Sequence, residues 1–213
     1  MIDLTPERAL IFRLTHVRNL PWILANGLQC RNSATRDPEF IQIGSAELIT
    51  RRGHRKVPVE PGGTLDDYVP FYFTPRSPMM LNVATGRNGV TRRPLRELVV
   101  LTSSLHTVQE QGRRFVFTDR HAYLEAAEFF SDIAELTRLD WLRLRAADFR
   151  RDPNDLAKFE RYQAEALIHQ HLPVGALRAI VCHGPTEDAY VRYLVQNHGT
   201  GTRVLSRPRW FVA

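Results

Sequence analysis

Short apolar segments alternate with polar segments that contain glycine or proline along the whole chain. Their β-branched and aromatic residues, bounded by turn residues, are typical of buried strands. Pro70 has no backbone N–H to donate, so its strand is expected to begin at a sheet edge or at a bulge. The segments that we predict to be strands are residues 9–15, 68–74, 98–102, 113–118, 177–183 and 203–206.

Apolar residues at helical spacing, together with capping residues, predict the helices between these strands. Asn19 and Ser77 are expected to be N-caps, and Pro21 and Pro78 suit the first turns that follow them. The segments that we predict to be helical are residues 20–26, 44–52, 78–85, 106–111, 123–130, 133–144 and 187–196.

Residues 156–172 fit two patterns. Leu156, Phe159 and Gln163 lie three or four positions apart, and propensity favours one long helix. Residues 163–168 could instead form a strand, which would place Gln163, Glu165 and Leu167 on one face. The pattern alone leaves both structures open.

The length and composition indicate one globular domain. The chain has 213 residues and 43% hydrophobic residues, without a repeat or a linker, so we expect a single domain over residues 1–213. No apolar run approaches the ~18 residues that cross a membrane, and no signal peptide is expected, so we predict a cytoplasmic protein without a membrane partner. Cys30 and Cys182 have no metal-like spacing, and we expect reduced thiols and no bound metal.

The charge is basic and comes almost entirely from arginine. The formal net charge is +6, and Lys56 and Lys158 are the only lysines among 29 basic side chains. The densest basic stretch, residues 50–58, precedes a Gly-Gly turn and an aromatic run. Guanidinium groups bind phosphate bidentately, so a polyanionic partner is indicated. A solvated basic loop before a buried strand fits the same composition.

Several sequence blocks resemble one known family. The blocks, in order, are LTH (residues 14–16) with NL (19–20), RR (51–52) before KVP (56–58), PGG (61–63), YVPFYF-x-PRSPM (68–79), FVFTDRH (115–121) and QAE (163–165). Together they resemble the DarT-type DNA ADP-ribosyltransferases, toxins of a bacterial toxin–antitoxin system. The resemblance covers nearly the whole chain.

The resemblance implies an α+β protein with the ADP-ribosyltransferase fold, in which helices flank a split mixed β-sheet and NAD lies in a cleft. It implies that the segment with Glu165 is a strand. It also implies transfer of ADP-ribose from NAD to a base of single-stranded DNA, with thymine expected, no metal, and a macrodomain antitoxin of the DarG type as partner. RNA or guanine as acceptor, or a nucleic-acid-binding module without catalysis, are the alternatives.

Three residues carry the expected chemistry. Cleavage of the nicotinamide–ribose bond develops positive charge on the ribose, which a carboxylate can balance. The resemblance assigns this carboxylate to Glu165 and implies an arginine that activates the base, Arg52 rather than Arg51. A guanidinium with a pKa above ~12 is a poor base, so we expect Arg52 to stabilise the deprotonated base and to grip the NAD diphosphate. His121 orients the ribose or the base, or is structural.

Further site residues follow from the resemblance. Arg13 stands where the family often has histidine. The residues expected to contact NAD are Arg13, Leu14, Thr15, His16, Asn19, Trp22, Arg31, Arg52 and Tyr72. Arginines are expected to hold DNA phosphates while methionines or aromatic rings stack on bases. The residues expected to contact DNA are Arg76, Ser77, Pro78, Met79, Met80, Leu81, Ala146, Ala147, Arg150 and Arg151.

Overall fold

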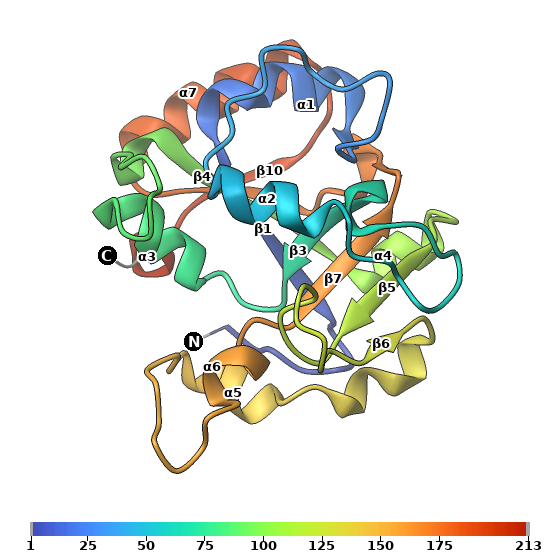
Figure 1. Ribbon diagram of the computed structural model, residues 1–213. Coiled ribbons are helices and arrows are strands. Elements are labelled where there is room, and N and C mark those ends of the chain that lie inside the picture. The colour runs from blue at the N-terminus through green and yellow to red at the C-terminus, as the bar shows by residue number, and fades with distance from the viewer. Residues whose placement is uncertain (1, 212–213) are drawn as a thin grey trace.

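A mixed eight-stranded sheet forms the centre of the protein, in a computed structural model that describes residues 2–211 (Figure 1). The strand order is β10-β9-β4-β1-β3-β7-β5-β6, and every pair is antiparallel except β9 with β10. A second, two-stranded sheet pairs β2 (Leu28–Gln29) with β8 (His171–Leu172). The large sheet comprises β1 (Leu10–His16), β3 (Tyr68–Tyr72), β4 (Leu98–Ser104), β5 (Phe115–Thr118), β6 (Phe129–Phe130), β7 (Glu165–His169), β9 (Ala179–Cys182) and β10 (Arg203–Ser206).

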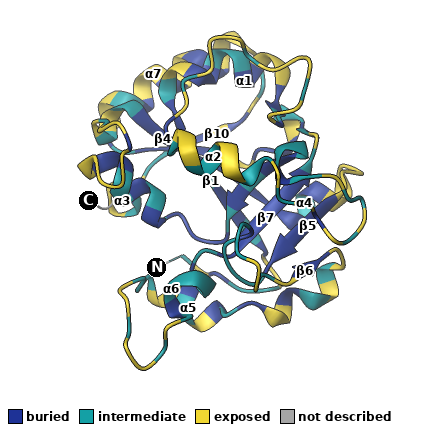
Figure 2. Ribbon diagram, in the orientation of Figure 1, coloured by how far each residue is buried: buried dark blue, intermediate teal, exposed yellow. Residues whose placement is uncertain are grey.

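Helices lie around the sheet and expose their outer faces. Figure 2 shows the strands largely buried and the helices exposed on the side turned to solvent. All residues of β4 and β9 are buried, which makes these strands the centre of the core. The α-helices are α1 (Leu20–Asn26), α2 (Ala46–Arg52), α3 (Pro78–Thr85), α4 (Leu105–Glu110), α5 (Trp141–Ala146), α6 (Lys158–Arg161) and α7 (Pro185–Asn197). None of the helices in residues 2–211 is both long and apolar enough to cross a bilayer.

The sheet splits between β1 and β3. β1 pairs with β4 along its whole length, and β3 with β7, but β1 and β3 pair only at Phe12 and Tyr72. Pro70 lies beside this split, and its carbonyl accepts a hydrogen bond from Arg13 Nη1 at 2.8 Å. The prediction that Pro70 marks a sheet edge or bulge was therefore wrong. β3 is an interior strand, and its proline tolerates this position because the neighbouring strand has diverged.

Two predicted helices were wrong. Residues 123–128 form turns rather than a helix, because Phe129 and Phe130 pair with β5 and the ring of Phe130 packs on Phe117 at 5.3 Å. The predicted helix at 133–144 is divided into a 3₁₀ helix (Ile133–Arg138) and α5. The division occurs at Asp140, whose side chain accepts the backbone N–H of Arg143 and so starts a new helix.

The ambiguous segment contains both kinds of structure. α6 covers Lys158–Arg161, and β7 then begins at Glu165, which lies opposite Tyr72 in β3. A single long helix is thus wrong. The strand that the resemblance implies for residues 163–165 is confirmed only from Glu165 onward, since Gln163 and Ala164 precede β7. Pairing of β7 with both β3 and β5 outweighs the helical propensity of the segment.

The two predicted N-caps differ. Ser77 caps α3, since its hydroxyl accepts the N–H of Met80 at 3.2 Å. Asn19 does not cap α1 with its side chain. Its amide instead donates to Thr15 Oγ1 and to the Ile41 carbonyl, both at 3.0 Å, and accepts the Ile41 N–H at 2.9 Å. Asn19 therefore ties β1 to the segment that precedes α2.

Asn19→Ala is expected to lower the free energy of unfolding by about 2 kcal/mol, because it leaves buried polar groups of Ile41 and Thr15 without a partner. Urea denaturation measures this change. Asn26→Ala is the matched control, since Asn26 is an exposed amide that makes one bond to Trp22 O. Equal losses in the two variants would contradict the role given to Asn19.

Candidate active site

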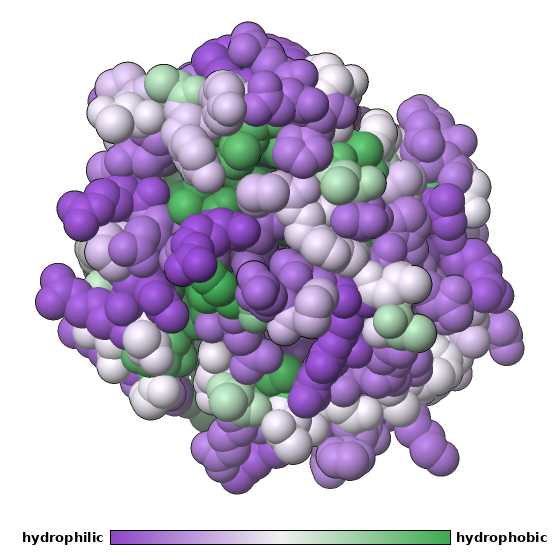
Figure 3. All heavy atoms as spheres, turned by 90° about the horizontal axis from the view of Figure 1, so that it is seen from above, coloured by the Kyte–Doolittle hydropathy of each residue, from purple (hydrophilic) through white to green (hydrophobic). Residues whose placement is uncertain are grey.

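A cavity of about 600 Å³ lies at the split in the sheet. Its walls come from β1, α1, α2, β3 and α3 and from residues 36–45. Seen from above, apolar side chains show in recesses between polar ones on the surface of the molecule (Figure 3). Both kinds of surface suit a ligand with flat rings and charged groups.

Arg52 and Glu165 meet in this cavity although 113 positions separate them in the chain. Arg52 is the last residue of α2, and Glu165 is the first of β7. Arg52 Nη1 donates to Glu165 Oε1 at 2.9 Å, and Nη2 donates to Oε2 at 2.7 Å. The side chains are 13% and 2% exposed. This bidentate geometry fixes the plane of the carboxylate.

Glu165 is held as an anion. Burial alone would raise the pKa of its carboxyl, but the charge of Arg52 and the hydrogen bonds from Arg52 and the Ala122 N–H outweigh burial and leave the pKa below its ordinary value. The Ala122 N–H donates to Oε1 at 3.0 Å. Burial would likewise lower the pKa of Arg52, and Glu165 raises it instead. The two groups thus keep each other charged.

His121 lies beside this pair as a neutral ring. Burial lowers its pKa, and the charge of Arg52 opposes the attraction of Glu165. Its Nδ1 lies 3.7 Å from Glu165 Oε1 and accepts the N–H of Tyr123 at 3.3 Å. With Nδ1 accepting, the proton of the ring is on Nε2. The contact with Glu165 is therefore not an ion pair.

Arg13 brings a second positive charge into the cavity. Burial lowers the pKa of its guanidinium to about 10, which leaves it charged at neutral pH. Its Nη1 donates to Pro70 O, and its buried Nε has no hydrogen-bond partner. Arg13 contacts no carboxylate among residues 2–211. An anionic group of a ligand would compensate this buried charge.

The residues predicted to contact NAD divide into two groups. His16 and Asn19 do not line the cavity and lie apart from the other predicted residues. His16 caps the following 3₁₀ helix and lies 3.3 Å from Glu97, while Asn19 holds Ile41. The predicted residues that do line the cavity are Arg13, Leu14, Thr15, Trp22, Arg31, Arg52 and Tyr72. Arg51 points away and pairs with Glu47 on the surface, so Arg52 is the arginine that reaches Glu165.

The residues predicted to contact DNA also divide. Pro78 and Met79 line the cavity, whereas Met80 is 1% exposed and lies in the core. Ser77 is buried as the cap of α3, and Leu81 is half-buried. In the second segment, Arg150 is bound to Asp148, Arg151 lies over the ring of Phe159, Ala146 is exposed, and Ala147 ends α5 with a positive φ.

Other parts of the site escaped prediction. Ala122 acts through its backbone N–H, which leaves no signal in a sequence. Residues 36–45 line the cavity with Asp37, Phe40 and Gln42, although their sequence is irregular and polar. Within residues 2–211 no three His, Cys, Asp or Glu side chains are grouped to hold a metal ion.

The split mixed sheet with its cavity has the ADP-ribosyltransferase fold, since the structure matches a solved DarT over its whole length. The chain belongs to the DarT family: the family's sequence model, described as "ssDNA thymidine ADP-ribosyltransferase, DarT", matches residues 12–212. The fold and family expected from the sequence are thereby confirmed.

Relatives with known names support this assignment. A DNA ADP-ribosyl transferase of Escherichia coli O127:H6 is 47% identical over 209 residues, which cover 98% of this chain and 96% of that protein. The structure of Thermus sp. 2.9 DarT in complex with ADP-ribosylated ssDNA is similar with a TM-score of 0.89 and 33% identity, over 100% of both chains. The same Thermus protein in complex with NAD+ gives a TM-score of 0.83 and 31% identity, over 97% of this chain and 99% of that one.

Glu165→Leu is expected to lower the free energy of unfolding by about 3 kcal/mol, because it leaves the Arg52 charge buried without a partner. Adding Arg52→Leu to the first change is expected to recover most of this loss, since both charges are then absent. Denaturant titrations of the two single variants and the double variant measure the coupling. Losses that simply add would show that the two side chains do not depend on each other.

Proposed function

We propose that this protein transfers ADP-ribose from NAD to the thymine base of single-stranded DNA and releases nicotinamide. The observation that carries the proposal is the Arg52–Glu165 pair in the cavity at the split of the sheet. The names of the relatives, which include complexes with NAD+ and with ADP-ribosylated ssDNA, support the same reaction.

Glu165 acts on the ribose. Its carboxylate is ionised and its plane is fixed, so it can accept hydrogen bonds from ribose hydroxyls and balance the positive charge that develops when the nicotinamide bond breaks. Because the group is already oriented in the free protein, little reorganisation is needed at the moment of reaction.

Arg52 acts on the acceptor base. Each of its terminal nitrogens uses one N–H on Glu165 and retains another. The ring nitrogen of the base loses its proton to solvent and bonds to the ribose as the nicotinamide–ribose bond breaks. The remaining Arg52 donors can stabilise the negative charge that the base carries in this step. Since Glu165 already neutralises Arg52, the diphosphate is better matched by Arg13, whose buried charge has no carboxylate partner in residues 2–211.

The base must leave any duplex to react. A ring nitrogen of thymine that pairs in double-stranded DNA is hidden there, so an unpaired or flipped base is the substrate. Pro78 and Met79 of α3 and Phe159 of α6 line the cavity and supply apolar surface for the base. The basic balance of the chain, +6, favours the strand electrostatically.

The proposal also includes that this protein is a cytoplasmic toxin, which a macrodomain antitoxin of the DarG type neutralises. The family resemblance supports the toxin and its antitoxin, and the sequence pattern supports the cytoplasmic location. These statements place the substrate DNA, NAD and the antitoxin in one compartment.

The test is incubation with NAD and single-stranded oligonucleotides that differ in one base, followed by mass spectrometry. A mass increase of one ADP-ribose on the thymine-containing strand is expected, with nicotinamide released in equal amount. Glu165→Gln is expected to reduce the rate by at least about 100-fold, since the carboxylate acts directly on the reacting sugar.

Glu160→Gln is the matched control, because Glu160 lies in α6 of the same segment and is half-exposed outside the cavity. Its rate is expected to stay close to wild type. Labelling of guanine, or of RNA but not DNA, would replace the proposed acceptor. Strand binding without nicotinamide release would show a binding module instead of an enzyme.

A further inference from the structure

Arg76 is engaged by the protein itself. Its Nε and Nη2 donate to the carbonyl of Arg209 at 3.0 and 2.8 Å. Arg209 belongs to the C-terminal turn, the 3₁₀ helix Pro208–Trp210. Two of the three nitrogens of Arg76 therefore face a peptide group, and its fork is not available for the bidentate phosphate contact that the sequence suggested.

The C-terminal turn is fixed in place by a second contact. The ring of Trp210 packs edge-on against Phe12 of β1, with ring centroids 5.4 Å apart. Phe211 is buried against the core. Arg209 directly precedes these two anchors, its side chain is exposed, and it forms no ion pair within residues 2–211. Its guanidinium is thus presented to solvent from a rigid base.

Tyr162 connects this turn to the other proposed DNA segment. Its hydroxyl donates to the Arg76 carbonyl at 2.8 Å, and its ring stacks against Phe149 at 5.3 Å. Phe149 lies in the loop that carries Arg150 and Arg151. Tyr162 is buried and stands three positions before Glu165. One side chain therefore sets the spacing between two basic surfaces and lies next to the candidate catalytic strand.

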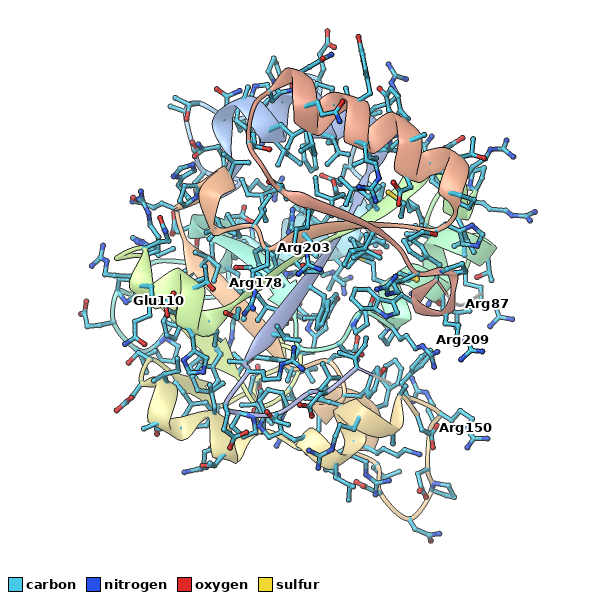
Figure 4. The ribbon with its side chains drawn as sticks, turned by 180° about the vertical axis from the view of Figure 1, so that it is seen from behind. Arg87, Glu110, Arg150, Arg178, Arg203 and Arg209 are labelled. Atoms are coloured by element: carbon cyan, nitrogen blue, oxygen red, sulfur yellow. The ribbon has the colours of Figure 1, made fainter. Side chains whose placement is uncertain are left out.

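The charges on these two surfaces differ. Arg150 is bound by Asp148 at 2.9 Å, which also binds Lys158. The guanidinium of Arg76 meets Arg209 at its backbone carbonyl, and neither side chain has a carboxylate partner among residues 2–211. Positive charges that no carboxylate neutralises favour a polyanionic partner. Seen from behind, Arg209 and Arg87 project at the same edge of the molecule as Arg150 (Figure 4).

We propose that the C-terminal turn forms one wall of the path of the DNA strand, with Arg209 contacting a phosphate and Arg76 acting as the positioning residue that holds the turn. This inference rests on the proposed function, since it assumes a single-stranded DNA substrate. The opposite wall is the loop at residues 146–151, and Tyr162 joins the two.

The test measures binding of a fluorescent single-stranded oligonucleotide, without NAD, as a function of salt. Arg209→Gln is expected to raise Kd roughly threefold to fivefold at low salt and to reduce the slope of log Kd against log salt by about 0.7, the loss of one phosphate contact. In turnover assays, the KM for DNA is expected to rise, while kcat and the KM for NAD stay unchanged. Arg203→Gln is the control, an exposed arginine in β10 on the back face (Figure 4).

Substitution of Arg76 separates its role in holding the C-terminal turn from the effect of its positive charge. Arg76→Lys keeps the charge but cannot bind the Arg209 carbonyl with two N–H groups, so it is expected to weaken binding about as much as Arg209→Gln. The double variant is expected to be little worse than either single variant. Melting temperatures confirm that each variant is folded.

If the Arg209→Gln and Arg203→Gln variants bind the oligonucleotide with the same Kd, the inference is overturned. The proposed function fails separately, if wild type binds the strand but transfers no ADP-ribose to it. In that case, weaker DNA binding by the Arg209→Gln variant would still support the inference that the C-terminal turn forms one wall of the DNA path.

Discussion

The contact between Arg52 and Glu165 is the interaction on which the site depends. Neither charge is stable alone in a cavity that leaves them 13% and 2% exposed. Each side chain stabilises the charged form of the other. Together they place an oriented carboxylate where a sugar can reach it. The fold supplies the two elements that make this possible, since α2 ends and β7 begins at the same cavity.

The split in the sheet is what gives the pair room. β1 and β3 diverge beside Pro70, and Arg13 bridges the gap to the proline carbonyl. A continuous sheet would close this space with backbone hydrogen bonds. The proline, which has no N–H to lose there, and the arginine, which reaches across, are therefore both parts of the site's architecture. Arg13 adds a buried positive charge that has no carboxylate partner in residues 2–211.

Local pattern predicted the strands well because each carries its own apolar and β-branched residues, as in residues 98–102 and 203–206. It failed where partners distant in sequence decide the outcome. Phe129 and Phe130 look helical until β5 is present to pair with them, and Asn19 looks like a cap until Ile41 lies beside it. Met80 could not be separated from Met79 by pattern, since the orientation of α3 decides which of them is buried. Glu165 and Arg52 were linked only by family resemblance, because spacing along the chain carries no information about a contact between α2 and β7.

The central claim is that Arg52 holds Glu165 as an oriented anion. An NMR titration of the Glu165 side-chain carboxyl, in wild type and in Arg52→Gln, tests it most directly. The account predicts a pKa below the ordinary value of 4.5 in wild type, and a clear rise in the variant, where burial acts without the compensating charge. A carboxyl that titrates at or above its ordinary value in wild type, or that is unchanged by the loss of Arg52, would contradict the account.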